Sequence, residues 1–138
     1  SLLLPADHRV RSSDAEGGGV STTPGEAIPA GARGLDIGPA TVERFAEALR
    51  DARTVLWNGP LGLFEEPPFD EGTRAVAMVI ASTRAHSVVG GGDTASAVRK
   101  FGLDRRFTHV STGGGATLEF LSGMTLPGVE ALSEASSS

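Results

Sequence analysis

Two runs of three glycines are the residues of this sequence best suited to chemistry. The first, in SVVGGGDT, is Gly90–Gly92 followed by Asp93 and Thr94, and the second, in HVSTGGG, is Gly113–Gly115. Each run follows a short apolar segment and precedes a helical pattern. The first turn of a helix presents unpaired N–H groups and a partial positive charge. Because glycine lets a phosphate approach that backbone closely, both runs favour phosphate binding.

A glycine-rich turn between a strand and a helix also forms for steric reasons alone, so one run is weak support for a ligand site. Here a third turn, WNGPLG (Trp57–Gly62), follows another strand-like segment, which strengthens the phosphate interpretation. Asp93 has two roles open to it. Its carboxylate could contact Mg²⁺ beside a phosphate, or it could cap the helix that begins there.

The elements that must position these turns alternate along the chain. Short apolar segments that break into Gly, Pro or Asn are typical of buried parallel strands, and four are expected: Leu2–Pro5, Thr54–Pro60, Ser87–Gly92 and His109–Gly115. Amphipathic or capped patterns predict helices between them: Pro39–Ala52, Phe69–Ala85, Asp93–Gly102 and Ala116–Gly123. This alternation predicts an α/β fold, a parallel sheet with crossover helices in a Rossmann-like three-layer α/β/α arrangement, here a partial domain.

Two segments lack such a pattern. Residues 8–34 are polar and without a period, so we expect an extended surface connection with a short strand near Val20. The last residues, 133–138, are expected to form a disordered tail. The strand-like start at Leu2 and the absence of an initiator Met suggest a piece of a longer chain.

Composition narrows the class of protein. The chain has 138 residues, which suits one domain, and its net charge of −5 argues against binding to nucleic acid or to a membrane surface. It contains no cysteine, which excludes disulfides and thiolate metal sites. No signal peptide or membrane-spanning run is apparent, so a cytoplasmic protein is expected.

Two other nucleotide motifs fit poorly. GGGDTA matches G-x-G-x-x-A, but a dinucleotide site would add an acidic residue about 20 positions later, where this chain has none. A Walker A motif is absent as well. Lys100, the only lysine, lies too far along the helix from Asp93 to reach a phosphate at its start, so we expect a solvated helix end.

Four blocks, taken in order, resemble phosphoglycerate kinase: GLDIGPATVERFAEAL, TVLWNGPLGLFE, SVVGGGDTASAV and HVSTGGGATLEFLSGMTLPGVEAL. The resemblance runs from Leu2 to Leu132 and is weakest over residues 8–33. It implies that residues 1–132 are part of a C-terminal, nucleotide-binding domain, with strand order 3-2-1-4-5-6 and Leu2–Pro5 as the third strand. It implies a Mg²⁺-dependent transferase of glycolysis that moves a phosphoryl group between 1,3-bisphosphoglycerate and ADP.

The same resemblance assigns roles to residues. Nucleotide binding falls to Asn58, Pro60, Glu65, Gly91, Gly92, Asp93 and Thr94. Within this set Asp93 would contact Mg²⁺ and Glu65 would accept hydrogen bonds from the ribose hydroxyls. Stabilisation of the transferring phosphoryl group falls to Gly113, Gly114 and Gly115. Considered without the resemblance, Glu65 is one member of an exposed acidic pair with Glu66.

The resemblance also implies what this chain lacks. Phosphoglycerate would bind an N-terminal domain that the 138 residues do not contain, together with the cations of the reaction. We therefore expect ADP or ATP as the partner of this chain, a monomeric full-length enzyme, and no turnover by the chain alone. The alternative function is a nucleotide-binding fragment without catalytic activity.

Overall fold

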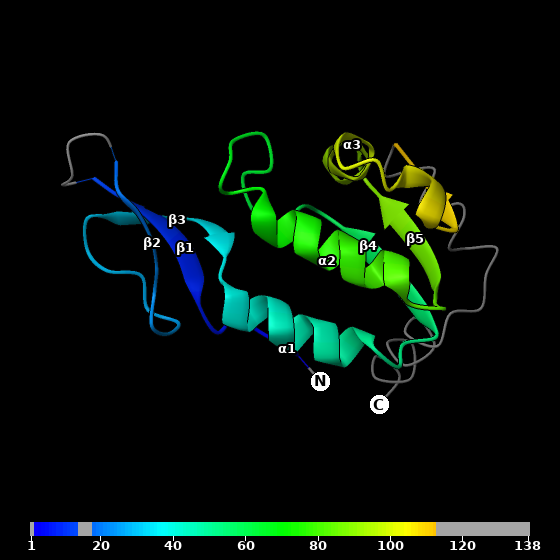
Figure 1. Cartoon of the computed structure of the whole chain (residues 1–138), viewed down its shortest axis with the longest axis horizontal. Helices are drawn as coiled ribbons and strands as arrows, with labels where there is room; N and C mark the ends of the chain where they lie inside the picture. Colours follow the sequence, from blue (N-terminus) through cyan, green and yellow to red (C-terminus); the bar gives the residue numbers. More distant parts are fainter. Residues whose placement is uncertain (1, 14–17, 113–138) are drawn as a thin grey trace, which may run out of the picture.

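The computed structural model describes residues 2–13 and 18–112, and these form two three-stranded sheets and a layer of helices (Figure 1). One sheet is parallel, in the order β4 (Thr54–Asn58), β5 (His86–Gly90) and β6 (His109–Val110). The helix α2 (Glu71–Ser82) connects β4 to β5, and α3 (Gly92–Lys100) connects β5 to β6. The α/β class with a parallel sheet and crossover helices is therefore confirmed.

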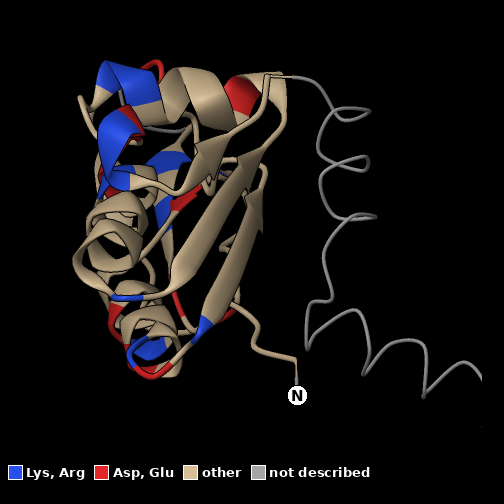
Figure 2. Cartoon of the chain, turned by 90° about the vertical axis from the view of Figure 1, so that its right-hand side faces the viewer, with Lys and Arg blue, Asp and Glu red and all other residues tan. Residues whose placement is uncertain are grey.

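One face of the parallel sheet carries the core. Val55 and Trp57 of β4 and Val89 of β5 pack with apolar side chains of α2 and α3, among them Ile80 and Val98. The helix α1 (Pro39–Leu49) adds partly buried residues to the same cluster. Figure 2 shows these helices on one side of the strands. In the part of the chain that the structure describes, no helix is long and apolar enough to cross a bilayer.

The other sheet corrects the expectation for residues 8–34. It is antiparallel, with β1 (His8–Ser12) between β2 (Val20–Thr22) and β3 (Ala32–Ile37). Only the short strand near Val20 was predicted. In β1 a single apolar residue, Val10, is buried, and charged or polar residues surround it in sequence. A strand with one buried position lacks the alternation that sequence patterns detect.

The expectation of a strand at Leu2–Pro5 is wrong for this structure. These residues have no regular secondary structure, and Leu2 is 82% exposed. A strand needs a neighbour for its backbone hydrogen bonds. In the order 3-2-1-4-5-6 this segment would pair with the second strand, and the parallel sheet of the described residues contains only β4, β5 and β6. The expected helix at Ala116–Gly123 and the expected tail at 133–138 lie outside the described residues.

The start of α1 is capped by a residue distant in sequence. The N-cap position, Gly38, has no capping side chain. Instead the Asp7 carboxylate accepts hydrogen bonds from the backbone N–H groups of Ala40 (3.1 Å) and Thr41 (2.8 Å) and from the Thr41 hydroxyl (2.6 Å). Burial by itself raises the pKa of Asp7, but these hydrogen bonds outweigh it and lower the pKa below its ordinary value of 3.8.

Replacing Asp7 with Ala should lower the free energy of unfolding by about 2 kcal/mol, because the N–H groups of Ala40 and Thr41 lose their acceptor and the Thr41 hydroxyl keeps only the backbone carbonyl of residue 7. The stabilisation by Asp7 should be present above about pH 4 and should disappear as the pH falls through the lowered pKa. Urea unfolding at several pH values measures both effects. Asp51→Ala, at an exposed position, is the control, and an equal loss in the two variants would contradict the capping role.

A second buried carboxylate, Asp36, joins β3 to α2. It accepts hydrogen bonds from the N–H groups of Ile37 and Gly72, both at 2.8 Å, and its side chain is fully buried. A Cβ atom at Gly62 or Gly72 would collide with this carboxylate, so both positions require glycine. Burial raises the pKa of Asp36 to about 6, although the two N–H groups and Arg9 act in the opposite direction.

Because the pKa of Asp36 is raised on folding, its contribution to the free energy of unfolding should depend on pH. The folded protein should hold this proton up to about pH 6, whereas the unfolded chain releases it near 3.8. The favourable contribution of Asp36 is thus complete below about pH 4 and is lost as the pH rises through 6. The difference in unfolding free energy between the original protein and Asp36→Asn should therefore fall over this interval. A difference that rises with pH would show that the pKa is lowered instead.

Candidate functional site

Three loops meet where the parallel strands end. They are residues 59–62 after β4, Gly91 with the first turn of α3 after β5, and residues 111–112 after β6. Since all three strands are parallel, their carboxyl ends lie on one edge of the sheet, which is where ligands bind in open α/β folds. The edge predicted from the glycine turns is therefore present.

Contacts between the loops show how close they come. The N–H of Gly59 donates to the Thr94 hydroxyl at 2.7 Å. A Cβ atom on Gly91 would lie 2.9 Å from Oδ1 of Asn58, and one on Gly92 would lie 3.4 Å from the carbonyl oxygen of Thr112. A side chain at Gly91 would collide with Asn58, whereas one at Gly92 would be in contact with the loop after β6. The structure thus brings together Asn58, Gly91, Gly92 and Thr94.

The start of α3 resolves one of the alternatives for Asp93. The N-cap is Gly91, whose φ of +92° favours glycine, and the helix begins at Gly92. Asp93 is the second helical residue, is exposed and makes no capping hydrogen bond. Asp93 therefore does not serve as the N-cap, and its carboxylate lies in the first turn of a helix, where negative charge is stabilised.

The turn after β4 is held rigidly by side chains. Trp57 donates its indole N–H to the carbonyl of Gly59 at 2.8 Å, and the buried hydroxyl of Thr73 accepts from the N–H of Leu61 at 3.2 Å. Thr94 is only 1% exposed, so its hydroxyl serves first to hold Gly59. Pro60 lies within this turn and is half-buried.

Glu65 lies on the same connection, seven residues after Asn58, and its side chain is exposed. The residue before it, Phe64, is buried, and its carbonyl accepts a hydrogen bond from Nζ of Lys100 at 2.6 Å. Lys100 is exposed at the end of α3, as expected, and this hydrogen bond is an additional contact. The sequence carries no signal for this contact, because it joins the end of α3 to a loop 36 residues earlier.

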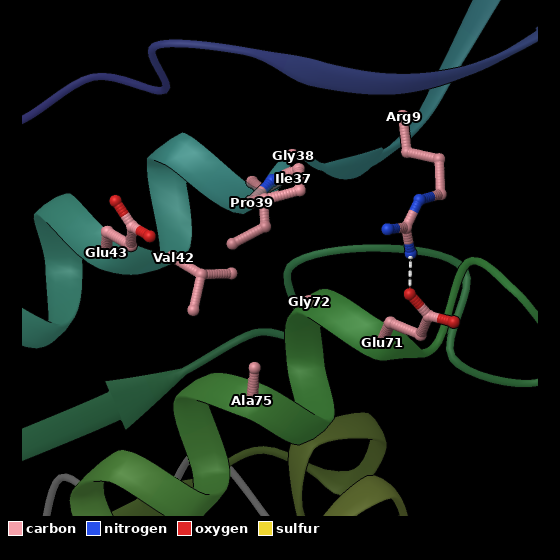
Figure 3. Close-up of a pocket in the computed structure, with 9 residues that line it drawn as sticks. All are labelled: Arg9, Ile37, Gly38, Pro39, Val42, Glu43, Glu71, Gly72 and Ala75. Atoms are coloured by element: carbon pink, nitrogen blue, oxygen red, sulfur yellow. Dashed lines mark hydrogen bonds and ion pairs between the residues drawn. The ribbon is translucent and has the colours of Figure 1, made fainter. Parts of the chain in front are cut away.

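A pocket of about 300 Å³ lies between the starts of α1 and α2, and none of its lining residues belongs to the three loops (Figure 3). Arg9 and Glu71 form an ion pair at its rim. The sequence suggested no site there. The predicted residues Gly113, Gly114 and Gly115 lie outside the described residues.

Comparison with known proteins gives one consistent result. The family model described as phosphoglycerate kinase matches residues 1–124. A phosphoglycerate kinase of Thermus thermophilus is 58% identical over 134 residues, and one of Solibacter usitatus is 53% identical over 131. Each alignment covers 95% of this chain but only 34% and 33% of the relative, so the chain spans about one third of the length of these relatives.

Solved structures agree with the sequence comparison. The structure of phosphoglycerate kinase from Coxiella burnetii has a TM-score of 0.78 at 41% identity, over 94% of this chain and 34% of that protein. The enzyme from Pyrococcus horikoshii has a TM-score of 0.69 at 36% identity, over 94% and 32%. With the family model matching most of its length, this chain belongs to the phosphoglycerate kinase family of glycolytic kinases.

Proposed function

We propose that this chain supplies the ADP- and ATP-binding part of a phosphoglycerate kinase, within residues 1–132. The whole enzyme would transfer a phosphoryl group between 1,3-bisphosphoglycerate and ADP. The observation that carries the proposal is the meeting of three strand-end loops beside the first turn of α3. Because the chain belongs to the phosphoglycerate kinase family, we propose ADP or ATP as the ligand at this edge of the sheet.

In this proposal, different residues contact different parts of the nucleotide. The N–H groups at the start of α3, from Gly92 onward, would bind phosphate oxygens through the helix dipole. Asn58, which borders Gly91, would contact the phosphates from the neighbouring strand end. Pro60 and Glu65, on the connection after β4, would bind the adenosine. The loop Gly113–Gly115 would stabilise the phosphoryl group in transit.

The donor set fits Mg²⁺ shared with a nucleotide. Within residues 2–13 and 18–112 no group of three His, Cys, Asp or Glu side chains gathers around one point. Mg²⁺ in kinases is commonly bound by one or two carboxylates together with phosphate oxygens and water. Asp93 would provide that carboxylate, since it is exposed and is not used as a helix cap. When bound, Mg²⁺ neutralises charge on the phosphates; Asp93 would orient it.

In the full-length enzyme, Asp93→Ala should lower kcat/KM for phosphoryl transfer on the order of 10²-fold, because charge stabilisation is the main catalytic term in this chemistry. The preference for Mg·ADP over free ADP should fall as well. Steady-state kinetics across a Mg²⁺ titration measure both. Ser96→Ala, exposed on the same helix, is the matched control. Unchanged Mg²⁺ dependence in Asp93→Ala would remove the metal role.

The 138-residue chain by itself should bind ADP without turnover. Its only lysine, Lys100, already donates to Phe64, and phosphoglycerate is expected to bind outside this chain. Isothermal titration with Mg·ADP and a coupled assay with 3-phosphoglycerate and ATP test the two halves of this prediction. Measurable turnover by the isolated chain would mean that it contains a complete active site.

A further inference from the structure

The residues on either side of Glu65 are each held by a cation from a distant element. Nζ of Lys100, at the end of α3, donates to the carbonyl of Phe64 at 2.6 Å. The guanidinium of Arg11, on β1, forms an ion pair with the Glu66 carboxylate at 2.5 Å. These partners are 36 and 55 residues apart in sequence. Two elements from opposite ends of the described chain thus bracket one exposed side chain.

The antiparallel sheet holds the rest of this connection as well. Arg11 also lies over the ring of Phe69, at 4.9 Å from its centre. Arg9, two residues earlier in β1, donates to the carbonyl of Pro68 at 2.9 Å and pairs with Glu71 (Figure 3). The N–H of Leu63 donates to a β3 carbonyl at 2.8 Å. A connection without strand or helix structure therefore has its backbone held at several points.

Arg11 also makes the two neighbouring glutamates, Glu65 and Glu66, differ from each other, because it pairs with only one of them. Within the described residues Glu66 is engaged in an ion pair, whereas Glu65 is in none. An ion pair at a half-exposed position adds little to stability by itself. It does restrict the conformations of the residue next to Glu65, and ordering a chain in advance lowers the entropy cost of binding. The pairing thus leaves Glu65 as the carboxylate available to a ligand.

We infer that Lys100 and Arg11 are positioning residues that hold Glu65 for the ribose of the bound nucleotide. This rests on the proposed function, in which Glu65 accepts hydrogen bonds from the ribose hydroxyls. It adds a role for β1 and for the end of α3, neither of which carries a residue assigned to nucleotide binding. Neither cation is among the proposed nucleotide contacts, so both would act through the backbone and the side chain on either side of Glu65.

The test uses the full-length enzyme with Lys100→Met and Arg11→Met. Each should raise the KM for ATP about threefold and the double variant about tenfold, the range expected when one hydrogen bond to the ligand is weakened. The KM for 3-phosphoglycerate and kcat should stay within about twofold. The preference for ATP over 2′,3′-dideoxy-ATP should shrink in parallel, since this ratio reports the ribose hydroxyls. Lys100→Arg, which keeps the positive charge and a donor, should have a KM for ATP close to that of the original enzyme.

Matched controls separate positioning from loss of charge or of fold. Arg99→Met removes the exposed neighbour of Lys100, and Arg33→Met removes an exposed arginine of the antiparallel sheet. Both should leave the ATP KM and the ribose preference unchanged. A rise in the KM of both substrates with a fall in kcat in the Lys100 or Arg11 variants would indicate general disruption and would overturn the inference.

A third arm distinguishes this inference from the proposed function. Glu65→Ala should raise the ATP KM about tenfold and abolish the ribose preference, and adding Lys100→Met to it should have no further effect. If Glu65→Ala behaves so while Lys100→Met and Arg11→Met resemble the original enzyme, the positioning role alone is wrong. If Glu65→Ala changes neither quantity, the proposed ribose contact is wrong and the positioning role fails with it.

Discussion

The buried carboxylate of Asp36 ties the antiparallel sheet to the first turn of α2, beside the core contact that Ile37 makes. Its two oxygens accept N–H groups from β3 and from the first turn of α2, and Gly62 and Gly72 leave just enough room for it. The antiparallel sheet is thereby fixed against the connection between β4 and α2. That connection carries Pro60 and Glu65, so the geometry proposed for adenosine binding depends on a residue remote from any nucleotide.

The two buried aspartates show how hydrogen bonding decides the protonation of similar groups. Asp7 accepts three hydrogen bonds at the start of α1, and these lower its pKa despite burial. Asp36 accepts only two, and there desolvation by burial dominates, so its pKa is raised to about 6. Each carboxylate accepts hydrogen bonds from backbone N–H groups that would otherwise be buried without an acceptor. Their opposite pKa shifts follow from the balance of these two effects.

At the strand ends, tertiary contacts use several side chains and leave mainly backbone groups for the proposed nucleotide site. The hydroxyl of Thr94 is used to hold Gly59, and the indole of Trp57 is used to hold the same residue from its own strand. The first turn of α3 begins at this edge, and Asp93 in that turn is exposed. A site built from backbone N–H groups needs such support, because loops without it pay a large entropy cost on binding.

The sequence by itself determined the features that depend on neighbouring residues. Three kinds of feature have local signatures in the sequence. Apolar runs mark the parallel strands at Thr54, Ser87 and His109, helical periodicity marks the three helices between Pro39 and Lys100, and glycine marks the turns at the strand ends. The family was also evident from motifs at the strand ends, and the family model agrees. These predictions succeeded because propensity and pattern act over a few residues.

Only the tertiary structure decided the features made by residues far apart. Three features join residues from about ten to more than fifty positions apart. They are the pairing of β1 with β2 and β3, the capping of α1 by Asp7, and the contacts of Lys100 and Arg11 with the residues beside Glu65. Likewise Leu2–Pro5 has a strand-like sequence but no strand to pair with among the described residues. A strand exists only when another backbone satisfies its hydrogen bonds, and a charged side chain finds its partner only after the chain has folded.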